Sequence, residues 1–123
     1  MAKFIPDAAL DLIADYVDQS NIMHLCSAQP ANYAGIAAVS LADVALTPDT
    51  DFTKANGDTS GRKVTVAAKN GVPIDTSGTG NHIAIASTGD STLRFVTTCT
   101  SQAVTSGNTA NFPAWDIETG DPT

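Results

Sequence analysis

The sequence predicts a mainly β protein, an antiparallel β-sandwich or a jelly-roll-like barrel, with one α-helix near its N-terminus. In the second half of the chain, short apolar or alternating segments are separated by clusters of Gly, Asp, Asn, Ser and Thr, which favour tight turns. These clusters occupy residues 57–61, 75–81, 87–92 and 105–109. The N-terminal residues instead carry apolar side chains at helical spacing, which predicts a helix before the sheets.

The length predicts one domain spanning residues 1–123, with a mass of 12.6 kDa. We expect a helix over about residues 6–20, a β-rich region over 22–118 and a flexible tail over 119–123. A chain of this size buries enough surface for a core without disulfide or metal support. Aromatic residues make up only 6% of the chain, so the core is thin and would gain stability from assembly into an oligomer.

The helix is predicted from its N-terminal residues and from one apolar stripe. Pro6 suits the first turn, and Asp7 suits the positive end of the helix dipole. Positions i, i+3, i+4 and i+7 are apolar: Leu10, Ile13, Ala14 and Val17. The aspartates fall largely on another face, which we expect to be solvated: Asp7, Asp11, Asp15 and Asp18.

The strands are placed by alternation and by the turn clusters between them. They are expected over residues 22–28, 42–46, 63–67, 71–75, 82–87, 93–99 and 110–118. Residues 36–46 fit either a helix or a strand, and Pro48 favours a strand at their end. Residues 47–60 are polar and are expected to form an exposed loop. Pro73 predicts an edge strand or a bend for its segment, and the last run is expected to close the sheet.

The charge and hydropathy exclude several classes of partner. The formal net charge is −7 at pH 7, which repels phosphate backbones and argues against nucleic-acid binding. No apolar run approaches the length of a membrane span. No continuous apolar stretch precedes Asp7, so we expect no signal peptide.

The cysteines and histidines do not form a recognisable metal or redox motif. Cys26 and Cys99 lie on different predicted strands and are expected to be free thiols, with a disulfide as the alternative if those strands are neighbours. His24 is expected to be hydrogen-bonded within a sheet, and His82 to lie at the surface. The aspartates near Asp49 lack the spacing of a calcium loop, so we expect no metal site.

The sequence also lacks the motifs of catalysis. No nucleophile elbow and no phosphate-binding glycine loop is present, and turn formation accounts for most aspartates. We therefore expect no enzymatic activity, no catalytic residues and no cofactor. Trp115, the single tryptophan, fits either the core or an interface.

The order of several segments resembles a family of small virion structural proteins from tailed double-stranded DNA bacteriophages. The helix at residues 9–17 is followed by the sequence Met-His-Leu-Cys-Ser-Ala-Gln-Pro at residues 23–30. Further along come Gly-Asp-Thr-Ser-Gly-Arg-Lys at residues 57–63 and the strand at 82–85. The turn at residues 101–109 then leads to Ala-Trp-Asp-Ile at 114–117. The resemblance covers nearly the whole chain.

The resemblance implies a capsid decoration, or cement, protein. Such a protein is made in the host cytoplasm, binds the outer surface of the major capsid protein shell and stabilises it, commonly as a trimer at threefold positions. The contact is expected at residues 3–5 or at an edge strand, and the interface residues at Phe4, Ile5, Trp115 and Ile117. The alternative is a low-copy tail, neck or fibre component; a small hydrolase or lysis factor is a third reading.

Overall fold

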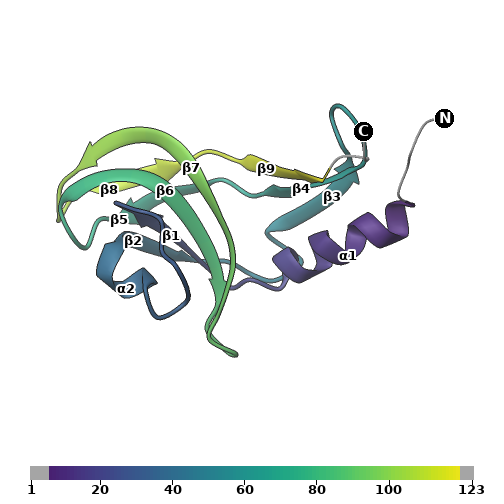
Figure 1. Ribbon diagram of the computed structural model, residues 1–123. Coiled ribbons are helices and arrows are strands. Elements are labelled where there is room, and N and C mark those ends of the chain that lie inside the picture. Colours follow the sequence, from purple (N-terminus) through teal and green to yellow (C-terminus); the bar gives the residue numbers. More distant parts are fainter. Residues whose placement is uncertain (1–5, 120–123) are drawn as a thin grey trace.

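The computed structural model describes residues 6–119 and confirms the predicted class: antiparallel sheets in a β-sandwich-like arrangement, with one N-terminal helix (Figure 1). The helices are α1 (Asp7–Asp18) and a single-turn α2 (Ile36–Val39). The strands are β1 (Ile22–Cys26), β2 (Ser40–Ala45), β3 (Phe52–Asn56), β4 (Arg62–Val66), β5 (Lys69–Pro73), β6 (Gly78–Ser87), β7 (Thr92–Val104), β8 (Thr109–Phe112) and β9 (Trp115–Thr119).

The largest sheet has four strands in the order β2–β1–β6–β7, and all its neighbours are antiparallel. β6 and β7 form a long hairpin that arches over the other strands (Figure 1). The register of this hairpin shifts between Gly80 and His82 and again between Ile85 and Ala86. Such β-bulges increase the bend and the twist of a ladder, which accounts for the curvature of the hairpin.

Two smaller sheets face this arch. One has the order β3–β4–β9, and the other pairs β5 with β8. An isolated bridge between Ala42 and Ile74 connects β2 to the end of β5. The last predicted segment, 110–118, is therefore two strands in two sheets, because Pro113 cannot donate a ladder hydrogen bond and separates β8 from β9.

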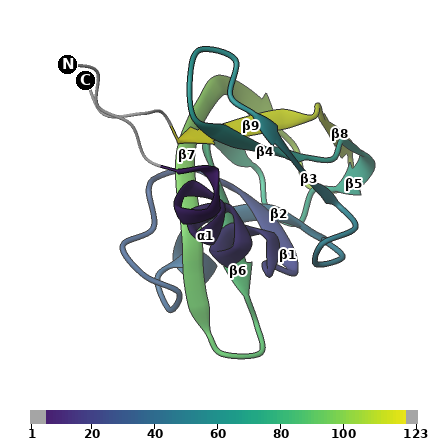
Figure 2. The ribbon, with the colours of Figure 1, turned by 90° about the vertical axis from the view of Figure 1, so that its right-hand side faces the viewer.

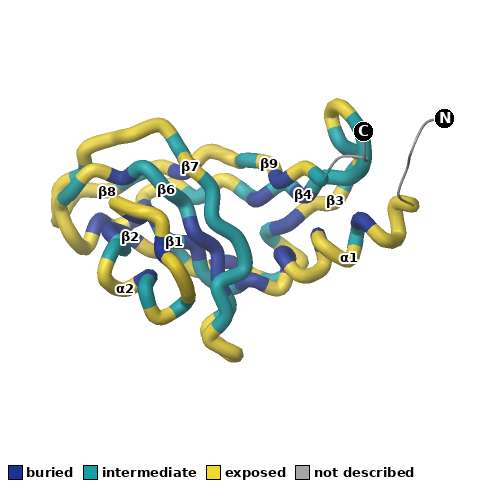
Figure 3. The backbone as a smooth tube through the Cα atoms, in the orientation of Figure 1, coloured by how far each residue is buried: buried dark blue, intermediate teal, exposed yellow. Residues whose placement is uncertain are grey.

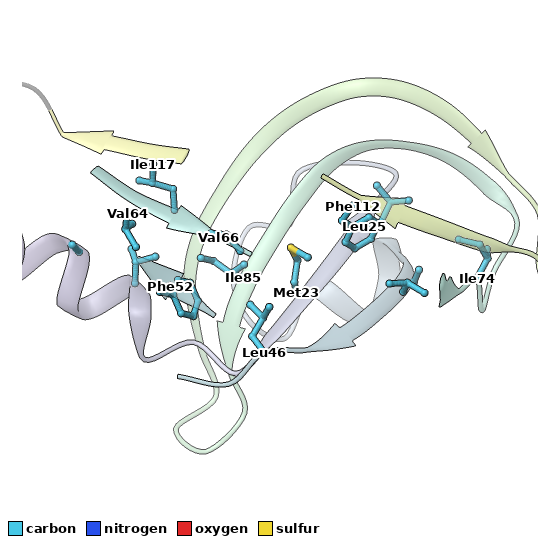
Figure 4. Close-up of a cluster of buried hydrophobic side chains, with 14 residues drawn as sticks. Met23, Leu25, Leu46, Phe52, Val64, Val66, Ile74, Ile85, Phe112 and Ile117 are labelled. Carbon is cyan, nitrogen blue, oxygen red and sulfur yellow. The ribbon is translucent and has the colours of Figure 1, made fainter. Parts of the chain in front are cut away.

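The core lies between these layers (Figure 4). Met23 and Ile85 are neighbours across β1 and β6, and both have no exposed surface. Val64 and Val66 face them from β4 at 1% and 0% exposure. The apolar members of successive strands meet in one cluster because alternate residues of each strand point to the same side.

Helix α1 packs against β3 and β4, with a further contact to β7 (Figure 2). Its buried side chains are Leu10, Ala14, Val17 and Asp18. The predicted stripe is confirmed for three of its four members. Ile13 differs, because 49% of its surface is exposed.

Several boundaries differ from the sequence-based expectation. Residues 47–60 contain β3, whose only buried residue is Phe52, so the strand shows no alternation in its sequence. Residues 36–46 contain both elements that were considered, the short α2 and then β2. β7 continues to Val104 through polar residues, because its second half is an exposed edge. β9 reaches Thr119, which pairs with Arg62, so the strand extends one residue into the predicted tail.

Candidate functional site

A groove opens between the arching strand β7 and the strands β8 and β9. Its volume is about 480 Å³. Its apolar lining comes from Leu25, Ile83, Val104, Phe112 and Trp115. Polar lining comes mainly from the threonines of β7. Asp116 also lines the groove, but its carboxylate accepts a hydrogen bond from Thr65 and pairs with Lys63. The groove is therefore apolar with a few polar groups at its margin, as is typical of binding sites.

The groove runs along a backbone edge and not only against side chains. Four consecutive residues of β7 line it: Thr97, Thr98, Cys99 and Thr100. Consecutive residues of a strand point to opposite faces, so they line one cavity together only where the cavity follows the edge of the strand. β7 is also the last strand of its sheet, and within residues 6–119 no strand pairs with its outer side. An unpaired edge of this kind is a template for a further strand.

Trp115 lies where β9 meets the groove. Its ring lies 6.1 Å from that of Phe95, centroid to centroid, with an interplanar angle of 30°. Its indole Nε1 is buried and has no hydrogen-bond partner among the described residues. A buried donor without a partner costs about 1–3 kcal/mol.

Beside the groove, strand β6 approaches β1 so closely that position 80 requires a glycine. A Cβ atom placed on Gly80 would lie 2.6 Å from Cδ1 of Leu25 and 2.7 Å from its Cγ. Any larger residue at this position would push Leu25 towards the groove. Gly80 therefore lets β6 lie close against β1 while the cavity stays unfilled.

A second candidate surface is the solvent-facing side of α1. Leu12, Ile13 and Tyr16 are the exposed large hydrophobic residues, at 68%, 49% and 47%. Ala9 is also exposed, and with the other three it gives positions i, i+3, i+4 and i+7. These four residues form an apolar stripe, which we call the outer face of α1. Figure 3 shows how much of α1 is exposed. Single exposed apolar residues are normal, whereas contiguous patches mark interaction sites.

The predicted solvated aspartate face is wrong in part, because basic residues of β3 and β4 pair with it. Arg62 Nε donates to Asp11 Oδ1 at 2.9 Å, and Lys54 contacts both Asp15 and Asp18. Asp18 is 3% exposed. Asp7 and Asp15 nevertheless remain exposed, and the side of the helix that packs on the sheet is formed mainly by Leu10, Ala14 and Val17.

Tyr16 joins the outer face to the start of β7. The guanidinium of Arg94 lies 4.3 Å from the centroid of the Tyr16 ring, and its Nη1 donates to the Tyr16 carbonyl at 3.0 Å. The same guanidinium pairs with Asp90 at 3.0 Å. The C-terminal half of α1 is therefore fixed against the hairpin by stacking and by hydrogen bonds.

The histidines are placed much as the sequence indicated. His24 Nδ1 is hydrogen-bonded to Ser40 Oγ at 2.9 Å, which confirms the prediction of a sheet histidine. Burial lowers the pKa of His24, and the nearby charge of Asp43 opposes this shift. His82 is half-buried, and its Nδ1 lies 2.6 Å from Asn81 Oδ1.

Both cysteines are free thiols. Burial is the main cause that raises the pKa of Cys26, to about 11, and the charge of Cys99 adds to the shift. Burial also raises the pKa of Cys99, which lies beside the groove. β6 separates their strands, so they are not the neighbours that a disulfide was expected to require.

The predicted interface residues fall in three different places. Phe4 and Ile5 lie outside the described residues. Trp115 is half-buried at the groove. Ile117 belongs to the core cluster, with 8% of its surface exposed. The structure thus brings only Trp115 to a candidate surface.

The sequence analysis missed both candidate surfaces, although the outer face of α1 is visible as a pattern in the sequence. The spacing of Ala9, Leu12, Ile13 and Tyr16 is readable as a second helical stripe. The groove depends on which strands are neighbours, and no local pattern contains that information. Within residues 6–119, no group of three or more metal-ligating side chains gathers, and no helix is long and apolar enough to cross a membrane.

In comparisons with known proteins, no family model, no curated protein and no solved structure matches the chain.

Proposed function

We propose that the chain is a capsid decoration protein of a tailed double-stranded DNA bacteriophage. It binds the outer surface of the shell formed by the major capsid protein, as a homo-oligomer, and stabilises that shell without catalysing a reaction. The resemblance of its segment order to small virion proteins supports the phage setting. The acidic charge and the thin core agree with a part that gains stability by docking on a lattice.

The observation that carries the proposal is the outer face of α1. The side of α1 that packs on the sheet is formed by Leu10, Ala14 and Val17, as in an ordinary amphipathic helix. The outer face is a second apolar stripe, which the sheet does not cover. Leu12 and Tyr16 are one helical turn apart and would enter a hydrophobic depression of the capsid subunit together. Symmetry repeats each such contact in an oligomer, so modest individual contacts give firm attachment.

The first test measures the copy number of this chain against the major capsid protein in purified virions, by quantitative mass spectrometry. A ratio near one, or a simple fraction of it, supports a lattice-wide decoration protein. Trace copy number would instead assign the chain to the tail, neck or fibre. Absence from the particle would overturn the structural role.

The second test addresses the surface itself. We expect the double variant Leu12→Ser and Tyr16→Ser to bind undecorated capsids about tenfold more weakly or worse, because central apolar contacts dominate binding energy. Ala38→Ser is the matched control, since Ala38 is exposed on α2, away from this face. Co-sedimentation with capsids measures both. Unchanged binding of the double variant would remove α1 from the proposed contact.

A further inference from the structure

The groove beside β7 lies between two strand edges and not only one. Residues 97–100 of β7 line it on one side, and residues 110–113, which lead from β8 towards β9, line it on the other. Within residues 6–119, β7, β8 and β9 are each the last strand of their sheet. Because consecutive residues line both walls, the cavity follows a backbone edge on each side. The groove is thus shaped to hold an extended chain.

Of the two walls, β7 is the one that suits pairing with a further strand. Residues 95–104 contain no charged residue and no proline, which are common means of keeping an edge strand without a partner. Thr98, Thr100 and Gln102 line the groove from this edge, and all three are exposed. The opposite wall is interrupted by Pro113, which has no amide hydrogen to donate.

The β-bulge in the hairpin leaves part of this edge with few ladder partners. Between the pairs that Thr98 and Gln102 form, β6 offers only Asn81 opposite residues 99–101 of β7. A bulge leaves backbone groups of the longer strand unpaired. Residues on both sides of the bulge line the groove, so the bend does not turn the edge away from it. The backbone groups most in need of a partner therefore lie beside the cavity.

The charges around the groove select an uncharged occupant. Asp116 is the only charged residue among those that line it. Its carboxylate is already engaged, because Thr65 donates to Oδ1 at 2.6 Å and Lys63 Nζ lies 3.5 Å from Oδ2. A charged side chain placed in the groove would lose its water without gaining a partner. Apolar side chains at alternate positions of an extended chain fit the lining instead.

We propose that the groove binds an extended, uncharged segment of another protein, which adds to β7 as a strand. A segment that enters between two walls has to be free on both of its edges. Each of the nine described strands is already paired on at least one edge, so a second copy of this chain has no described strand to donate. Among the remaining residues, 1–5 include Lys3, and 120–123 include Asp121 and Pro122. The inference is independent of the proposed function, because it concerns a surface other than the outer face of α1.

The test uses a panel of synthetic peptides of six residues, which span about 20 Å as a strand. In each peptide threonine alternates with valine, isoleucine or phenylalanine, and both ends are capped so that no charge remains. Trp115 lines the groove and is the only tryptophan, so its emission reports binding. We expect a saturable change with at least one member of the panel, and none when an apolar residue of that peptide is replaced by glutamate. No saturable change with any uncharged peptide would overturn the proposal, as would equal binding of the glutamate form.

Backbone methylation of the peptide separates strand pairing from the filling of an apolar cavity. Two forms of the peptide carry N-methyl groups, one on each set of alternate nitrogens. Both forms keep every side chain, but one of them can no longer donate hydrogen bonds to β7. We expect that form to bind at least about tenfold more weakly, because several hydrogen bonds are lost together. Undiminished binding of both forms would mean that the groove takes an apolar ligand and not a strand.

A matched pair of variants tests the edge of β7 in the protein itself. Thr98→Lys places a charge on this edge and is expected to weaken peptide binding about tenfold or more. Thr53→Lys is the control, because Thr53 is also an exposed threonine on an edge strand, β3, and does not line the groove. Circular dichroism shows whether each variant is folded. Unchanged binding by folded Thr98→Lys, or an equal loss in Thr53→Lys, would exclude the edge of β7 as the contact.

Amide hydrogen exchange then locates the bound peptide, and light scattering tests the competing occupant. The amides of residues 97–104 are expected to exchange more slowly when the peptide is bound, and those of β3 to be unchanged. Protection elsewhere, without protection of β7, would contradict strand addition. The oligomeric state is expected to be the same in the unmodified chain and in Thr98→Lys. An oligomer that dissociates on this substitution would show that a second copy covers the edge, contrary to the proposal.

Discussion

At the scale of single residues, the glycines of this chain serve different purposes that only the structure separates. Gly57 lies at the end of β3, where its amide donates to the Gly61 carbonyl at 2.9 Å. A Cβ atom here would lie 2.0 Å from the backbone oxygen of Ser60 and 2.3 Å from Oε1 of Glu118. Gly89, in the turn between β6 and β7, has open space around the same position.

This difference predicts that replacing each glycine by alanine changes the stability of the protein by different amounts. Gly57→Ala is expected to lower the free energy of unfolding by about 1–3 kcal/mol, because a backbone atom has to move. Gly89→Ala is expected to change it by less than about 0.5 kcal/mol. Urea unfolding followed by circular dichroism measures both. Equal effects would show that the turn after β3 relaxes freely.

His24 predicts how stability depends on pH. Burial lowers its pKa in the folded state below the ordinary value of 6.5, so the unfolded chain binds the proton more readily. The contribution of His24 to the free energy of unfolding is therefore expected to be fully present well above pH 6.5, and to be lost as the pH falls through about 6.5 towards the lower pKa of the folded state. Carboxylates with lowered pKa values, Asp51 among them, act in the same direction but at more acidic pH.

Urea unfolding at a series of pH values tests this, with His24→Gln and His82→Gln compared to the unmodified chain. The first variant is expected to lose the slope in this range and the second to keep it. If both variants kept the slope, another titrating group would be responsible.

At the scale of elements, the extent of α1 and its buried stripe were predictable, but its ion pairs were not. The stripe and the Pro6 start are local features, and the helix forms within one or two residues of the expected bounds. The partners of Asp15 and Asp11 are Lys54 and Arg62, about forty to fifty residues further along the chain, so no local pattern indicates these pairs.

Two leucines of α1 allow this orientation to be measured. Leu10 is 2% exposed and Leu12 is 68% exposed. Leu10→Ala is expected to lower the free energy of unfolding by about 2–5 kcal/mol, since it removes buried methyl groups and leaves a cavity. Leu12→Ala is expected to stay within about 0.5 kcal/mol. A large loss for Leu12→Ala in the isolated chain would mean that the outer face is already covered.

Some strands could be predicted from the local sequence, whereas others depend on pairing with distant parts of the chain. Alternating apolar residues placed β4 and the centres of β6 and β7 correctly. β3 and the end of β7 were missed because they are polar and depend on pairing: Phe52 to Asn56 form a ladder with β4, and residues up to Val104 pair with β6. A strand at an exposed edge has few buried positions, so its sequence does not alternate.

At the scale of the whole molecule, the class of fold followed from the turn clusters, while the candidate site did not. The groove exists because β7 ends one sheet and β8 and β9 belong to two others, and strand order is a property of the complete chain. Trp115 could be named as core or interface from its sequence neighbours. Its unpartnered indole nitrogen became visible only when the surrounding strands were in place.

Assembly predicts that thermal stability depends on concentration. Because an oligomer binds only folded chains, the unfolding temperature is expected to rise with protein concentration. Differential scanning calorimetry over a range of concentrations measures the unfolding temperature. A constant unfolding temperature for the unmodified chain would contradict self-association.

The two ends of the described chain meet at one residue. Arg62 pairs with Thr119 in the ladder of β4 and β9, binds Asp11 of α1, and lies close enough to Asp7 for that charge to raise its pKa (Figure 2). The chain is therefore a natural subject for circular permutation, with its termini fused and new ends opened in the exposed turn at residues 88–91. Such a permutant retains every strand ladder of the described residues. It should fold like the parent, because the ladders do not depend on where along the chain the ends are placed.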